Sequence, residues 1–216
     1  MFLSKILINP SSKEANVDLK NPYQMHRTIM KAFPNGIDRE KAAALYRIEH
    51  PTKNSMTNVD CVLVQSVIKP DWQFLVDRKK YLAEGYQKNP AILEFNPRIQ
   101  SNQIFQFRLV VNPTRRNRNN KKLEPILEQE NLLNWLMNKG IMHGFSIDPA
   151  NLLIRRLQVD MFEANQHNRR KVFTIHKVSF EGILEVEDSQ KILRVLENGI
   201  GRGKSFGCGL LSLAIV

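Results

Sequence analysis

The two halves of this 216-residue chain repeat one order of secondary-structure patterns, and this repetition constrains the fold more than any other feature. Each half begins with the alternating pattern of a strand, at residues 2–8 and 104–111, and each of these segments ends at an Asn-Pro pair. A helical segment, two strand segments, a second helical or irregular segment and a last strand follow. These segments are residues 22–33, 44–49, 59–66, 71–82 and 91–95 in the first half, and 126–139, 152–162, 171–180, 189–197 and 210–216 in the second.

This order, βαββαβ twice over, is that of the ferredoxin-like split βαβ fold, which RNA-recognition modules also use. We therefore expect an α+β protein with two tandem ferredoxin-like (RRM-like) βαββαβ domains. The expected boundary lies near residues 96–102, which gives an N-terminal domain of residues 1–100 and a C-terminal domain of residues 101–216. Because 42% of the residues are hydrophobic, the chain can bury one large core or two small ones, and the repeated order favours two.

The charge of the chain indicates a polyanionic partner. It has 32 Lys and Arg against 21 Asp and Glu, a formal net charge of +11 and a pI of about 9.8, which favours nucleic acid. A membrane is a poorer candidate, since no apolar run approaches the roughly 20 residues that span a bilayer and the N-terminus lacks the pattern of a signal peptide. Cys61 and Cys208 are isolated, so neither a disulfide framework nor a zinc site is expected. We expect a cytoplasmic protein with no metal and no other cofactor.

Five of the ten glycines fall within residues 199–209, directly before the apolar residues 210–216. Gly has no Cβ, so its backbone can come close to a phosphate, and Arg202 and Lys204 add positive charge there. A nucleotide-binding P-loop runs from strand to helix and needs a Gly where this chain has Asn198, so ATP binding is disfavoured. We interpret the segment as a phosphate-contacting loop; the alternative is a flexible turn before a C-terminal strand.

Residues 113–122 contain five basic side chains and no acidic one. A run of this kind is commonly a solvated, mobile surface segment. On a basic chain it is also suited to contact a nucleic-acid backbone, which makes Arg115 and Arg116 candidate binding residues.

The helix expected at residues 22–33 carries the candidate chemistry. Asn21 is a good N-cap, and Pro22 suits the first helical position. At about 100° per residue, the face expected to meet the core carries Met25, Ile29, Ala32 and Phe33. The opposite face carries Tyr23, Arg27 and Lys31, with His26 at the edge between the two faces. The four polar groups favour a catalytic site over a structural histidine.

Four segments carry a family resemblance: PYQMHRTIMKAF at residues 22–33, FRLVVNP at 107–113, FEGIL at 180–184 and GIGRGKSFGCGLLS at 199–212. Together, over nearly the whole chain, they resemble the CasE family, the CRISPR repeat-RNA endoribonucleases of type I-E Cascade. The resemblance implies tandem ferredoxin-like domains that bind the repeat RNA stem-loop and cut at its 3′ base without a metal. It also implies that the product, the processed crRNA, stays bound within Cascade beside the other subunits.

The same resemblance implies roles for individual residues. It makes His26 the catalytic histidine and Tyr23 an active-site tyrosine, while Lys31 matches a basic position that some members have. A hairpin that peaks near residues 165–171 corresponds to the family's RNA-contacting hairpin. The expected RNA-binding residues are Arg27, Arg115, Arg116, Arg169, Arg170, Arg202 and Lys204.

Metal-free RNA cleavage needs a base to deprotonate a 2′-OH and an acid to protonate the departing 5′-oxygen, and imidazole, whose unperturbed pKa is about 6.5, suits such work. Arg27 and Lys31 are expected to lower the pKa of His26, which favours the role of base, while the role of acid stays open. Tyr23 could orient the 2′-OH or His26, and Lys31 could stabilise charge on the phosphorane or the departing oxygen. The expected products carry a 5′-OH and a 2′,3′-cyclic phosphate, or a 3′-phosphate once the ring has opened.

Two other functions compete with this one. A non-catalytic RNA-binding module or ribonucleoprotein assembly subunit would use the same basic surface and leave the RNA uncut. A DNA-binding regulator fits less well, because no helix-turn-helix pattern is recognisable and the 2′-OH chemistry would be idle.

Overall fold

The computed structural model describes residues 1–53, 57–166 and 169–216. The chain divides into two units. The first comprises Met1–Asn96, Phe162–Phe173 and Ser205–Gly207, and the second comprises Pro97–Met161, Thr174–Lys204 and Cys208–Val216. None of the helices in these described ranges is long and apolar enough to span a membrane.

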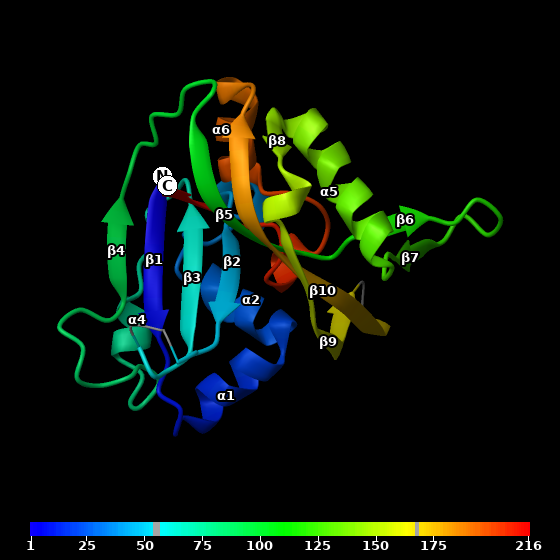
Figure 1. Ribbon diagram of the computed structural model, residues 1–216. Helices are drawn as coiled ribbons and strands as arrows, with labels where there is room; N and C mark the ends of the chain where they lie inside the picture. The colour runs from blue at the N-terminus through cyan, green and yellow to red at the C-terminus, as the bar shows by residue number, and fades with distance from the viewer. Residues whose placement is uncertain (54–56, 167–168) are drawn as a thin grey trace. The chain divides into compact units, whose positions relative to one another are not determined.

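The first unit contains a four-stranded antiparallel sheet (Figure 1), made of β1 (Phe2–Leu7), β2 (Leu45–Glu49), β3 (Cys61–Ser66) and β4 (Ala91–Glu94). Its strand order, β2-β3-β1-β4, is that of the expected ferredoxin-like fold. Alternation along β1 turns Ser4 and Ile6 to the core, where Ile6 pairs with Val62 and Ser4 accepts a hydrogen bond from Trp72 Nε1 at 2.9 Å.

The helices of the first unit are α1 (Lys13–Lys20), α2 (Pro22–Met30), α3 (Arg39–Ala42) and α4 (Gln73–Val76). Helix α2 begins as expected, because the Asn21 side chain accepts the N–H groups of Tyr23 at 3.0 Å and Gln24 at 3.3 Å. The residues expected to face the core are all buried, namely Met25, Ile29, Ala32 and Phe33. The helix ends at Met30, before the predicted end. Residues 71–82, predicted as a helical or irregular segment, contain only the single turn of α4.

The sequence pattern does not predict helix α1. A buried carboxylate joins this helix to α2. Asp18 of α1 is only 6% exposed and accepts hydrogen bonds from Thr28 Oγ1 at 2.7 Å and from the Tyr81 hydroxyl at 2.8 Å. A buried carboxylate is tolerated only when it is well hydrogen-bonded, so this arrangement specifies how the two helices pack.

The second unit contains β5 (Ile104–Val111), α5 (Gln129–His143), β8 (Phe145–Ile147), β9 (Leu153–Gln166), β10 (Arg169–Val186), α6 (Ser189–Asn198) and β11 (Leu211–Ile215), with the outer parts of β9 and β10 assigned to the first unit. The sheet order is β11-β5-β10-β8, with β9 also paired to β10. This again is the ferredoxin-like order, so the predicted fold is confirmed in both halves.

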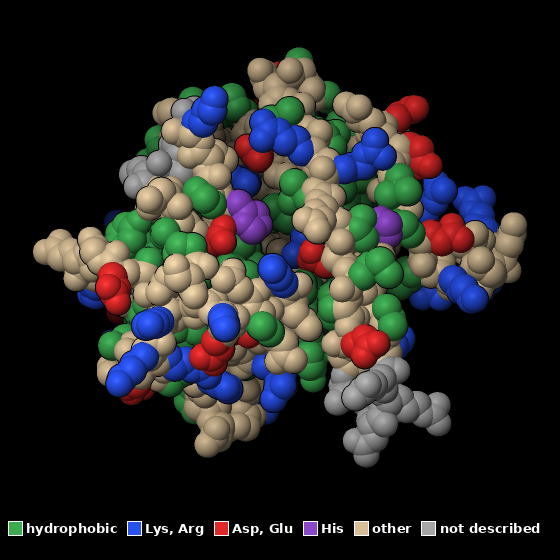
Figure 2. All heavy atoms as spheres, turned by 90° about the horizontal axis from the view of Figure 1, so that it is seen from below, with side chains coloured by type: hydrophobic (Ala, Val, Ile, Leu, Met, Phe, Trp, Pro, Cys, Tyr) green, Lys and Arg blue, Asp and Glu red, His purple; other side chains and the backbone are tan. Residues whose placement is uncertain are grey.

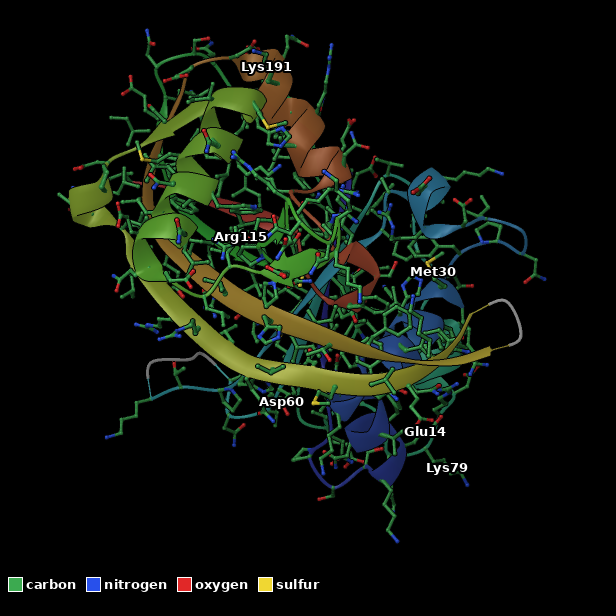
Figure 3. The ribbon with its side chains drawn as sticks, turned by 90° about the vertical axis from the view of Figure 1, so that its right-hand side faces the viewer. Glu14, Met30, Asp60, Lys79, Arg115 and Lys191 are labelled. Atoms are coloured by element: carbon green, nitrogen blue, oxygen red, sulfur yellow. The ribbon has the colours of Figure 1, made fainter. Side chains whose placement is uncertain are left out.

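The second strand of this unit differs from the prediction. It is divided into β8 and β9 by a 3₁₀ turn at Pro149–Asn151. Strands β9 and β10 then run side by side as a long hairpin (Figure 3). Residues 167–168, at the predicted peak of that hairpin, lie outside the described residues.

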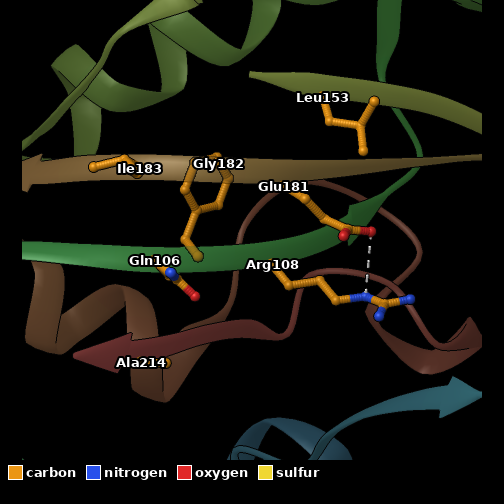
Figure 4. A pocket seen from close by; sticks show the side chains of 8 residues that line it. Gln106, Arg108, Leu153, Glu181, Gly182, Ile183 and Ala214 are labelled. Carbon is orange, nitrogen blue, oxygen red and sulfur yellow. Dashed lines mark ion pairs between the residues drawn. The ribbon is translucent and has the colours of Figure 1, made fainter. Parts of the chain in front are cut away.

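The sheet of the second unit also bears a shallow pocket of about 420 Å³ (Figure 4). Arg108 Nε lies 3.7 Å from the Glu181 carboxylate at this pocket. The residues that line it include none of the predicted site residues. The candidate chemistry therefore lies elsewhere.

Candidate active site

Helix α2 presents its polar face as predicted. Tyr23 and His26 are partly exposed and Arg27 is exposed. Residues three apart on a helix are neighbours, so the phenol and the imidazole share one patch of surface. The Arg27 guanidinium carbon lies 6.0 Å from the centre of the Tyr23 ring, and its Nη1 donates to Gln24 Oε1 at 3.3 Å. The structure thus groups a phenol, an imidazole and a guanidinium within one helical turn.

Lys31 stands apart from this group. It is the exposed C-cap of α2, five residues beyond His26, which corresponds to about 7.5 Å along a helix axis. Only its long side chain can bring the ammonium group near the imidazole.

The pKa of His26 is lowered from 6.5 to about 4, mainly because the imidazole is partly buried and secondly because the positive charge of Arg39 acts on it. The predicted direction is confirmed, but the predicted cause was wrong: Arg39 takes the place of Arg27 and Lys31. Arg39 begins α3, and its side chain is only 16% exposed. Its ion-pair partner Glu40 is 3.5 Å away and 84% exposed, so it neutralises the guanidinium weakly.

Sequence reasoning missed Arg39, and no local signal could have found it. The stretch Asp38-Arg39-Glu40 is an ordinary helix start, in which the Asp38 side chain accepts the Lys41 N–H at 2.8 Å. Only the tertiary fold brings Arg39 into electrostatic reach of His26.

The glycine-rich segment at residues 199–209 is tightly held at its base. Gly209 N donates to Val110 O at 2.7 Å, and Ile200 N donates to Gly209 O at 3.0 Å. Gly209 has a φ of +91°, and a Cβ there would lie 2.8 Å from the Ile200 carbonyl oxygen, so this position requires Gly. Arg202 is exposed at the loop and Lys204 is partly exposed.

The segment at residues 113–122 lies within a small two-stranded sheet rather than a plain arm. Its strands are β6 (Thr114–Arg116) and β7 (Leu123–Pro125). Arg115, labelled in Figure 3, and Arg116 are both exposed. The Arg116 guanidinium donates to the Lys121 carbonyl at 3.3 Å, which holds it close to the turn.

Arg169 and Arg170 open β10, and their side chains lie outside the described part of the structure. Elsewhere, Lys and Arg side chains are spread over the face shown in Figure 2, with Asp and Glu between them. The predicted RNA-binding residues therefore come from several elements of the chain: α2, β6, β10 and the glycine-rich loop.

Metal and thiol chemistry find little support among the described residues. Within residues 1–53, 57–166 and 169–216, no group of three or more His, Cys, Asp or Glu side chains could hold a metal ion. Cys61 and Cys208 are both buried free thiols, and burial raises the pKa of each, which makes them poor nucleophiles.

Comparison with known proteins gives consistent matches over the whole chain. A family model described as CRISPR associated protein matches residues 1–214. The CRISPR-associated endoribonuclease Cse3 of Thermus thermophilus is 33% identical over 220 residues, which cover 99% of this chain and 100% of the relative. The CRISPR system Cascade subunit CasE of Escherichia coli is 27% identical over 225 residues, covering 99% of each chain.

A solved structure is also similar to this chain over nearly its whole length. Thermus thermophilus Cse3 bound to an RNA representing a pre-cleavage complex superposes with a TM-score of 0.78 and 30% identity, covering 99% of this chain and 98% of that one.

We predict that the His26 imidazole of the free protein titrates in NMR spectra with a midpoint near 4. Arg39→Gln should raise this midpoint, whereas Arg27→Gln should leave it nearly unchanged, because Arg27 is turned toward Tyr23 and Gln24. An unchanged midpoint in Arg39→Gln would contradict the assignment of Arg39.

The pKa of His26 also predicts how stability depends on pH. Since His26 has a lower pKa in the native than in the unfolded chain, the unfolded chain binds more protons between about pH 4 and pH 6.5. The free energy of unfolding should therefore rise with pH across this window.

Proposed function

This chain belongs to the family of CRISPR-associated proteins, and on that premise we propose that it is a metal-independent endoribonuclease for CRISPR precursor RNA. It cuts at the 3′ base of the repeat stem-loop and retains the processed crRNA within Cascade, beside the other subunits, in the cytoplasm. The observation that carries the proposal is a neutral histidine and a tyrosine on the polar face of α2, in a chain of net charge +11.

His26 acts as the general base. With a pKa of about 4 it is neutral at pH 7 and can accept the proton of the 2′-OH. An RNA phosphate beside the imidazole would oppose the effect of Arg39 and raise the pKa of His26 toward the working pH, where a base is most effective. The 2′-oxygen then attacks the adjacent phosphorus, the bond to the 5′-oxygen breaks, and the departing 5′-oxygen takes a proton from water. The products are a 5′-OH and a 2′,3′-cyclic phosphate, which a further water can open to a 3′-phosphate.

Tyr23 and Lys31 assist this step. Tyr23 orients the 2′-OH or the imidazole, and Arg27 beside its ring limits the movement of the phenol. Lys31, on its long side chain, stabilises charge on the phosphorane or on the departing 5′-oxygen.

The domain limits and RNA contacts belong to the same proposal. Residues 1–100 form the domain with the catalytic helix, and residues 101–216 form the domain with the hairpin and the glycine-rich loop. The RNA-binding residues are Arg27, Arg115, Arg116, Arg169, Arg170, Arg202 and Lys204.

The function is tested with a hairpin repeat RNA incubated with the purified protein in EDTA. The RNA should be cut once, at the 3′ base of the stem, and a single 2′-deoxy substitution at the scissile nucleotide should abolish the cut because the nucleophile is gone. Uncut RNA would indicate a non-catalytic binding module. A rate that falls in EDTA and returns with Mg²⁺ would contradict metal independence.

Replacement of His26 should separate catalysis from binding. We expect His26→Ala to lose about 10²- to 10⁴-fold in single-turnover rate, the usual contribution of a general base, with stem-loop affinity within several-fold. His50→Ala is the matched control, because His50 is an exposed histidine paired with Asp60 at 2.7 Å. Wild-type cleavage by His26→Ala would remove His26 from the mechanism.

The basic residues should differ in how they affect binding. Arg115→Gln and Arg116→Gln should lower affinity for any RNA and flatten the dependence of log K on log salt by up to about one unit for each lost phosphate contact. Arg169→Gln and Arg170→Gln should instead reduce the preference for a stem-loop over unstructured RNA. Binding titrations at several salt concentrations measure both, with the exposed Lys79→Gln as a control outside the proposed set.

Gly203 of the glycine-rich loop has a φ of +79°, a backbone conformation that residues with a side chain rarely adopt. Gly203→Leu should therefore strain the loop and weaken RNA binding, although no charge is lost. If every one of these variants binds like the wild type, the RNA lies on another surface.

A further inference from the structure

The hydroxyl of Tyr46 lies between the first turn of α2 and the glycine-rich loop. Tyr46, in β2, is 2% exposed and belongs to the core of the first unit. Its Oη donates to the Pro22 carbonyl at 3.0 Å and lies 3.5 Å from the Ser205 carbonyl. Ser205–Gly207 belongs to the same unit as α2, so one buried hydroxyl joins the helix to the middle of the loop.

The Pro22 carbonyl connects this contact to the catalytic turn. Pro22 is the first residue of α2, and in an α-helix its carbonyl accepts the N–H of the residue four places on, which is His26. A carbonyl oxygen has two lone pairs and can accept both donors. The Tyr46 hydroxyl therefore bonds to the same oxygen that anchors the backbone of His26.

The loop is held from its other side by aromatic packing. Phe206, next to Ser205, lies with its ring centre 4.9 Å from that of Phe162 and 5.7 Å from that of Phe173. Phe162 and Phe173 stack on each other at 5.7 Å and come from β9 and β10, the two strands of the long hairpin. The segment at Ser205–Phe206 is thus fixed between the hairpin and Tyr46.

We propose that Tyr46 is a positioning residue for the cleavage reaction. Its hydroxyl sets the distance between the first turn of α2 and the loop at Ser205, so that His26 and the loop meet the same stretch of RNA backbone. Tyr46 itself touches no RNA: it acts through its hydrogen bond to the Pro22 carbonyl and its close contact with the Ser205 carbonyl. This inference rests on the proposed function.

The test is Tyr46→Phe, which keeps the buried ring and removes only the hydroxyl. Because a misplacement of about 1 Å can cost about 10²-fold in rate, we expect the single-turnover cleavage rate to fall by about 10- to 100-fold, with stem-loop affinity within about 3-fold. Tyr86→Phe is the matched control: it removes another tyrosine hydroxyl of the first unit, one that donates to Asn58 Oδ1 at 3.3 Å rather than to a residue of α2. It should change the urea midpoint of unfolding little and leave the cleavage rate within about 3-fold.

Phe206→Leu loosens the loop from its other side. It should show the same loss of rate with retained affinity, and the double variant Tyr46→Phe/Phe206→Leu should lose less than the sum of the two effects on log rate, because both act on one connection. A wild-type rate in Tyr46→Phe, or equal losses in Tyr46→Phe and Tyr86→Phe, would overturn the inference alone. Absence of cleavage by the unmodified chain would overturn the proposed function, and the inference with it.

Discussion

The candidate site depends on how α2 is held, and the Asp18 carboxylate is central to that. It is buried between α1 and α2 and accepts hydrogen bonds from Thr28 and Tyr81. Breaking such a network by removing one partner costs far more than a surface ion pair is worth, because the remaining groups stay buried and unsatisfied. With the helix fixed in rotation by this network and by its apolar stripe, Tyr23 and His26 must lie on its open face. The chemistry of the site is therefore set by packing that itself takes no part in the reaction.

The second constraint is electrostatic. Partial burial and the Arg39 charge both favour the neutral form of His26, which leaves the imidazole ready to accept a proton but a weak base in the free protein. In the mechanism that we propose, a substrate phosphate reverses part of this effect, since a negative charge favours the imidazolium that forms in the reaction. On that proposal, binding of the substrate strengthens the base. Such an arrangement makes activity depend on a well-placed phosphate rather than on the histidine alone.

The parts of the molecule that local pattern controls could be predicted from the sequence. Strand β5 lies at residues 104–111 as predicted, and α2 starts at Pro22 because the Asn-Pro signal is strong. Helix α1 was missed because its sequence, KEANVDLK, has almost no apolar stripe; its buried residues are Ala15 and the charged Asp18. A helix held by a buried carboxylate has no hydrophobic periodicity to detect.

The candidate site could likewise be predicted from the sequence only where local spacing determines it. Tyr23, His26 and Arg27 share one helix, so spacing alone brings them together. Arg39 and Tyr46 belong to other elements, and their proximity to α2 depends on tertiary packing that no local pattern encodes. This explains why the lowered pKa of His26 was wrongly assigned to Arg27 and Lys31. The sequence shows which charges lie on the same helix as His26, but it does not show that Arg39 of α3 comes close to it in the fold.

The glycine-rich loop shows why a composition signal needs geometry. Density of Gly suggested either a phosphate-contacting backbone or a flexible turn, and the hydrogen bonds at its base, together with the aromatic packing of Phe206, argue against a freely flexible turn. At least four of its N–H groups are already used within the chain. Gly199 N donates to Val195 O at 2.7 Å and Ile200 N to Gly209 O at 3.0 Å, while Cys208 N donates to Gly203 O at 3.3 Å and Gly209 N to Val110 O at 2.7 Å. Any phosphate contact must then come from the remaining N–H groups or from the side chains of the loop. The glycines serve first to let the loop fold back tightly on itself, and it is this fold that places Arg202 and Lys204 at its outer part.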